Sequence, residues 1–149
     1  MIDKSIRLSS TRQYKILSGM KQRCYNPNSL HFDRYGARGI SICDEWLGPA
    51  GALNFYNWSL SHGYADNLTI DRINNDIGYC PENCVWISGS FNTGYNDLFH
   101  KILNVIYNCP TFEEEYLNLL INQVHDVKQQ SILLSELSDI KNKKRRRQS

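Results

Sequence analysis

The chain has 149 residues, 41% of them hydrophobic, and a formal net charge of +2. This length allows one domain with a hydrophobic core and some appendages. No apolar run approaches the roughly 18 residues that span a bilayer, and residues 1–5 lack an apolar signal core. We therefore expect a cytoplasmic protein with no membrane partner.

Charge is distributed unevenly along the chain. Residues 1–38 contain eight Lys or Arg and two Asp, whereas residues 39–100 contain Arg72 and seven acidic residues. The last nine residues contain six Lys or Arg. Basic segments that flank an acidic middle are typical of a protein that binds a polyanion. For the tail, the alternative is a solvated end that only keeps the protein soluble.

The first predicted helix begins at a capping box in residues 10–13, STRQ, and runs to about Tyr25. Its apolar stripe is expected to face the core, and Arg12, Lys15 and Arg23 are candidates for contacts with a DNA backbone. Residues 35–39, YGARG, predict a tight turn that brings Arg38 close to a phosphate. Arg34 precedes this turn and joins the candidate DNA contacts. The alternative is a plain turn with solvated arginines.

A short strand over residues 40–43 and a helix over residues 50–61 follow. The aromatic residues of this helix are expected in the core rather than as platforms for stacked bases. Residues 68–73 and 84–87 then predict two short strands, separated by turn chemistry at residues 74–78. Ser88 can cap a helical turn that carries Asn92.

The last third predicts two helices, one from a capping box at residues 111–114 to about Val127 and one over residues 131–142. This region either packs back on the domain, binds a host or phage protein, or forms a homodimer. The predicted division is a nucleic-acid-binding domain (1–96), a helical extension (97–142) and a basic disordered tail (143–149). The tail residues predicted to contact phosphates are Lys143, Lys144, Arg145, Arg146 and Arg147.

Several motifs occur in one order: residues 20–27 (MKQRCYNP), 35–40 (YGARGI), 42–46 (ICDEW), 69–73 (TIDRI) and 81–86 (PENCVW). The region from 12 to 96 resembles HNH endonucleases, and more narrowly small phage-encoded HNH-like proteins. The resemblance implies an α+β fold with a small ββα-metal hairpin and helix, an N-terminal helix and an added helical segment. It also implies that the protein is located in the cytoplasm of an infected or lysogenic host cell.

The resemblance assigns roles to four residues. Asp71 ends the first strand and binds Mg²⁺ or Mn²⁺, together with Asn92 on the following helix, and Asn83 braces the loop. Arg72 stands where these enzymes carry the histidine that accepts a proton from water. Arginine stays protonated and cannot act as that base, although it can bind the scissile phosphate.

Three outcomes follow from Arg72. A metal-bound water supplies hydroxide without a protein base, another imidazole (His31, His62 or His100) takes that role, or the site only binds DNA. For His62 we expect instead a capping role at a helix C-terminus. The function is then a metal-dependent DNA endonuclease or nickase, with an inactive DNA-binding or inhibitory protein as the alternative.

The five cysteines do not suggest a disulfide framework in an intracellular protein. Four of them could converge on one structural zinc ion: Cys24, Cys43, Cys80 and Cys84. In the alternative, Cys24, Cys43 and Cys84 are small buried hydrophobic residues and Cys80 is exposed in the loop.

Overall fold

The computed structural model describes residues 6–88 and 97–148. It has an α+β fold that is mostly helical, as the sequence predicts at that level. The helices and strands are α1 (Arg12–Tyr25), α2 (Gly51–Ser61), β1 (Thr69–Arg72), β2 (Cys84–Ile87), α3 (Leu98–Asn108), α4 (Glu114–Asn122) and α5 (Val127–Gln148). Within the described residues, no helix is long and apolar enough to span a bilayer.

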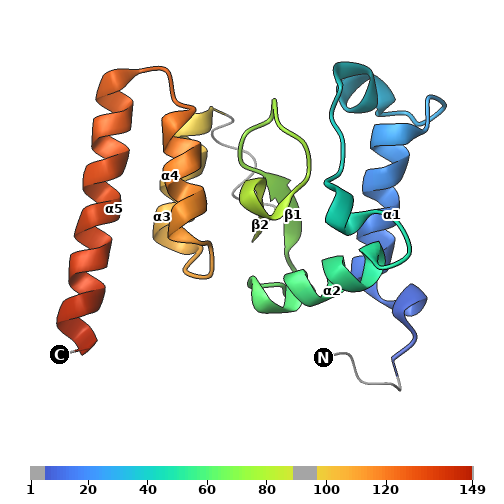
Figure 1. Cartoon of the computed structure of the whole chain (residues 1–149), viewed down its shortest axis with the longest axis horizontal. Coiled ribbons are helices and arrows are strands. Elements are labelled where there is room, and N and C mark those ends of the chain that lie inside the picture. The colour runs from blue at the N-terminus through green and yellow to red at the C-terminus, as the bar shows by residue number, and fades with distance from the viewer. Residues whose placement is uncertain (1–5, 89–96, 149) are drawn as a thin grey trace.

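The two strands form an antiparallel hairpin between two groups of helices, with α1 and α2 on one side and α3, α4 and α5 on the other (Figure 1). Successive side chains on a strand point to opposite faces. On β2, Cys84 and Trp86 therefore join the core of α1 and α2, whereas Val85 and Ile87 join the core of the C-terminal helices. The hairpin thus connects two hydrophobic cores.

The N-terminal core is built around aromatic rings. Trp46 and Phe55 are fully buried and meet edge to face, with ring centroids 5.0 Å apart. Trp58 and Trp86 pack beside them, so the aromatic residues of α2 are core residues, as predicted. The cap of α1 is Thr11, whose side chain accepts a hydrogen bond from the Tyr14 amide, one position later than the predicted capping box begins.

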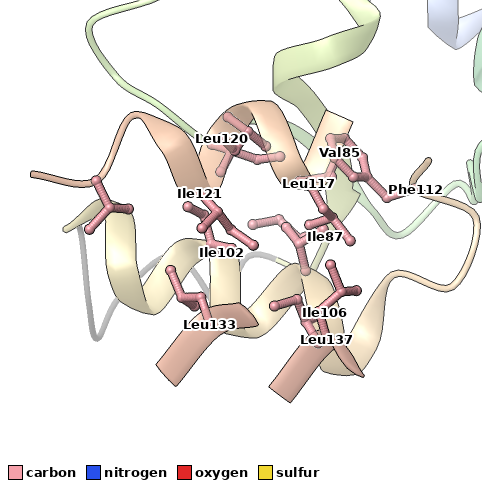
Figure 2. Close-up of a cluster of buried hydrophobic side chains, with 13 residues drawn as sticks. Val85, Ile87, Ile102, Ile106, Phe112, Leu117, Leu120, Ile121, Leu133 and Leu137 are labelled. Carbon is pink, nitrogen blue, oxygen red and sulfur yellow. The ribbon is translucent and has the colours of Figure 1, made fainter. Parts of the chain in front are cut away.

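The C-terminal core is purely apolar at its centre. Figure 2 shows Ile102 and Ile106 of α3, Leu117 of α4 and Leu133 of α5 converging on the hairpin side chains. Ile102 and Leu133 are fully buried. Of the three alternatives for this region, the structure supports the first, because these helices pack back on the hairpin.

The predicted strand over residues 40–43 is wrong, since only one isolated parallel bridge joins Ile42 to Tyr79. The amide of Ile40 already donates to the Tyr35 carbonyl, and a 3₁₀ turn starts at Asp44, so the strand has no room to extend. The bridge requires close backbone approach at Gly78. A Cβ atom there would lie 2.2 Å from the Ser41 carbonyl oxygen.

The capping box predicted at residues 111–114 is also wrong. Phe112 is buried in the C-terminal core, and α4 starts after Glu113 with no side-chain cap. It ends at Asn122 rather than near Val127, because the Gln130 side chain donates to the carbonyls of Ile121 and Val124.

Two other helices differ from the prediction. The sequence predicts no helix at the position of α3, and α5 continues through residues 143–148, where the sequence predicts a disordered tail. No Gly or Pro interrupts that helix.

Candidate nucleic-acid interface

The buried side chain of Asn83 forms hydrogen bonds with the backbone of the loop between the strands, residues 74–78. This side chain is 2% exposed. Its Oδ1 accepts from the Asn74 amide at 2.8 Å, and its Nδ2 donates to the carbonyls of Asn74, Ile77 and Gly78 at 3.0, 3.3 and 3.1 Å. Asn83 therefore braces the loop, which is the role that the resemblance implies for it. It does not reach the surface, so it is a positioning residue.

Arg72 fixes the same loop from the other side. Its side chain is buried, and Nη1 donates to the carbonyls of Asn75 and Ile77 at 2.7 and 2.8 Å. Its guanidinium carbon also lies 5.1 Å from the ring centroid of Tyr35 and 5.3 Å from that of Tyr79. Both contacts hold the guanidinium in place, and cation–π attraction stabilises its charge.

Asp71 points to the opposite face of β1, where Lys101 of α3 meets it. The Lys101 Nζ lies 3.2 Å from Oδ2 and 3.4 Å from Oδ1 of Asp71. The same Nζ donates to the Arg72 carbonyl at 2.8 Å and to Oδ1 of Asn75 at 3.1 Å. Burial raises the pKa of Asp71 above the usual value for an aspartate, although the Lys101 ammonium opposes this shift.

Asp71, Arg72 and Lys101 line one pocket of about 480 Å³ at the loop end of the hairpin, which we call the basic pocket. Four of its lining residues are cationic and one is acidic; the full set is Arg34, Tyr35, Arg38, Asp71, Arg72, Asn75 and Lys101. Asp71 and Arg72 thus share one pocket although they leave the strand in opposite directions. The turn at residues 35–39 places Arg38 in this lining, and Gly39 ends the turn at φ 83°. The contact of Arg38 with a phosphate stays a prediction.

The two outer arginines of the basic pocket are solvent-exposed. Arg38 pairs with Asp76 at 3.0 Å and also donates to the Asn75 carbonyl at 3.3 Å. Asp76 is 87% exposed at its side chain, so this pair is strongly screened by water. An incoming anion can therefore compete for Arg38 at small cost.

A second cavity, of about 270 Å³, lies between α1 and β1, and Arg12, Lys15 and Arg23 contribute to its lining. Arg12 donates to the Leu68 carbonyl at 2.7 Å and to the Tyr64 hydroxyl at 3.2 Å. Arg23 donates to the Tyr79 hydroxyl at 3.1 Å. Both arginines therefore also tie α1 to the hairpin region, whereas Lys15 is exposed.

The basic end of α5 does not join this surface. Figure 1 shows the loop between β1 and β2 at the top and the C-terminal end of α5 at the bottom left. Residues 143–147 are exposed there. Any phosphate contact they make is separate from the basic pocket. Asn92, the other predicted metal ligand, lies outside the described residues.

Histidine does not line the basic pocket in the described part of the chain. His62 follows α2, where its Nδ1 lies 2.8 Å from the Trp58 carbonyl and its Nε2 lies 2.6 Å from Glu113. The predicted capping role is confirmed. His100 pairs with Asp97 at the start of α3, and His31 is exposed.

The predicted zinc ligands fall into two groups. Burial raises the pKa of the Cys80 thiol to about 12 and that of Cys84 well above its usual value. Cys43 adds to both shifts, and Cys80 adds to that of Cys84, so these three thiols lie near one another. The charged neighbours of Cys24 are instead arginines. Within residues 6–88 and 97–148, no three or more His, Cys, Asp or Glu side chains form a group that could hold a metal ion. The zinc site stays a prediction.

Sequence reasoning missed Lys101 and Asn75. Lys101 lies on a helix that was not predicted, and its partner Asp71 is 30 residues away in the chain. Comparison with protein-family models, with curated proteins and with solved structures gives no match in any of the three. The HNH resemblance and its ββα-metal core therefore stay predictions from the motifs.

Proposed function

We propose that the protein binds DNA and that the basic pocket receives a backbone phosphate. The observation that carries this proposal is the convergence of Arg34, Arg38, Arg72 and Lys101 on one pocket that contains a single carboxylate. Guanidinium groups bind phosphate oxygens with paired hydrogen bonds, and an excess of cations over acids favours an anionic ligand.

The positions of the other cations favour a polymer over a small anion. The cavity of Arg12, Lys15 and Arg23 lies along β1, the strand that also ends in the basic pocket. A nucleic-acid backbone presents charges at regular intervals and can contact several such sites at once, whereas a free phosphate uses only one. The exposed cations at the end of α5 would add affinity without sequence information.

The test measures binding of a fluorescent DNA duplex by anisotropy between about 50 and 200 mM salt. Arg34→Ala should weaken binding and lower the slope of log affinity against log salt by about one, since one phosphate contact is lost. Lys128→Ala is the matched control, because Lys128 is an exposed cation on α5 that does not line the basic pocket. Equal effects of the two variants would refute the assignment of the pocket as the interface.

Endonuclease or nickase activity is the second candidate. The observation that favours it is the order β1, β2, α3, with Asp71 one residue before the end of β1 and lining the basic pocket. Supercoiled plasmid incubated with the protein and Mg²⁺ or Mn²⁺ tests cleavage. If Asp71→Ala abolishes cutting of the plasmid, the result supports the nuclease. If Asp71→Ala still cuts, the active site is elsewhere.

Salt-sensitive binding without cutting supports the DNA-binding or inhibitory protein. If neither activity is found, the remaining candidate is a protein-interaction module whose C-terminal helices bind a host or phage protein. On α5, Ile132 and Leu134 are partly exposed apolar side chains that such a partner could cover.

A further inference from the structure

We infer that the ammonium of Lys101 occupies the position that a divalent metal would need at Asp71, and we call Lys101 the resident cation of the basic pocket. Phosphate binding in this pocket then requires no metal. This inference rests on the proposed DNA-binding function for the role of the pocket. The claim about the cation itself rests only on the contacts of Lys101.

The oxygen atoms around the Lys101 ammonium come from three groups. They are the carboxylate of Asp71, the backbone carbonyl of Arg72 and the side-chain amide of Asn75, at 2.8 to 3.4 Å from Nζ. Carboxylate, carbonyl and amide oxygens are the ligands that hard divalent cations also use. An ammonium has three N–H donors, and three acceptor groups meet it here.

Buried residues hold the groups on both sides of the Lys101 contacts in place. The Lys101 side chain is 10% exposed and that of Asp71 19%. Lys101 lies next to Ile102, which is fully buried in the C-terminal core and fixes this turn of α3. Asn83 and Arg72 fix the loop that carries Asn75, as described above. Both sides of the contact are therefore anchored by buried groups.

A divalent ion does not fit this arrangement. To bind Asp71 it would have to approach oxygen atoms that already surround a positive charge, and the like charges repel strongly at that distance. With Lys101 in place, these oxygens lie 2.8 to 3.4 Å from its Nζ, which are the distances of contacts with an ammonium group. The metal that the HNH resemblance implies is thus replaced, at Asp71, by a cation of the chain itself.

The ammonium also explains how a carboxylate can line a pocket for phosphate. Without Lys101, the Asp71 charge would face the ligand and repel it. With Lys101 in place, the pair is neutral, and the charges of Arg34, Arg38 and Arg72 remain to attract the phosphate.

The first test is Mn²⁺ binding, measured by loss of the electron paramagnetic resonance signal of free Mn²⁺. We expect wild type and Asp71→Asn to bind equal amounts. One additional Mn²⁺ per chain in wild type would overturn the inference. Lys101→Ala, if it unfolds cooperatively like wild type, should gain a Mn²⁺ that the double variant Lys101→Ala/Asp71→Asn lacks. No gain would show that these oxygens do not form a cation site, and would also overturn it.

The second test is duplex DNA binding in EDTA and in Mn²⁺. Wild-type affinity should be the same in both, and loss of binding in EDTA would refute the resident cation. Lys101→Ala should bind roughly tenfold more weakly in EDTA, because the freed Asp71 charge repels phosphate, and should recover with Mn²⁺ or with Asp71→Asn. Lys128→Ala should show neither the loss nor the recovery.

The two proposals can fail separately. If Arg34→Ala weakens DNA binding while wild type holds a Mn²⁺ at Asp71, the DNA-binding function stands and the resident cation is refuted. If wild type binds no Mn²⁺ at Asp71 and no DNA either, the function fails while the cation assignment stands.

Discussion

Asn83→Ala offers a direct test of how the loop at residues 74–78 is held. The substitution removes one hydrogen bond accepted by Oδ1 and the contacts of Nδ2, whose two N–H groups are shared among three carbonyls, all from a side chain that is 2% exposed. A buried hydrogen bond contributes about 1 kcal/mol net, and its loss leaves unpaired backbone groups behind. We expect the free energy of unfolding to fall by about 3–4 kcal/mol.

That loss is a large fraction of the roughly 5–15 kcal/mol that stabilises a typical domain. Urea unfolding followed by tryptophan fluorescence measures it, because Trp46, Trp58 and Trp86 are all buried in the N-terminal core. Asn57→Ala is the matched control: Asn57 is exposed on α2, and a change there should stay within about 0.5 kcal/mol. A loss below about 1 kcal/mol for Asn83→Ala would refute the bracing role.

Three further outcomes are expected. Burial raises the pKa of the Cys109 thiol from 9.0 to about 11, so alkylation of Cys109 at pH 8 should be roughly a hundredfold slower in the folded chain than in urea. The contribution of the protonated thiol to the free energy of unfolding should be lost as the pH rises from 9 to about 11. Equal alkylation rates in the folded and unfolded chain would contradict the burial. The charged neighbours of Cys24 are Arg23 and Arg72, which disfavour a zinc ion beside this thiol. Elemental analysis of protein purified without added metal should therefore find less than about half an equivalent of zinc, and a full equivalent would support the predicted zinc site. A fragment of residues 1–96 should not unfold cooperatively, because Val85 and Ile87 would lose the core of the C-terminal helices, and a sharp transition would show that this part is an independent domain.

The hairpin could be predicted because its signals are local. The β-branched residues around Ile70 and the turn residues at 74–78 identify both strands within one or two positions, and the bracing role of Asn83 follows from its place in the loop. Helix α3 could also have been found, since Leu98, Ile102, Val105 and Ile106 recur at helical spacing and Asp97 accepts from the His100 amide as a cap.

Other features depend on contacts between distant parts of the chain. Arg12 and Arg23 were predicted only as DNA contacts, but each also donates to a tyrosine hydroxyl more than 50 residues away. Such partners leave no signal in the neighbouring sequence. The same holds for Lys101, whose chemistry is set by Asp71 and Asn75 and not by the residues beside it on the helix.

Strand alternation explains why the basic pocket needs both halves of the chain. On β1, Asp71 faces the C-terminal helices and meets Lys101, while Arg72 faces the N-terminal half and lies against Tyr35. The pocket forms at the end of the strand, where groups from both faces can reach the same space. Because Arg34 and Arg38 come from one half and Lys101 from the other, a change that loosens either core should alter the spacing of these cations. The proposed affinity for DNA is therefore coupled to the packing of helices that lie on opposite sides of the hairpin.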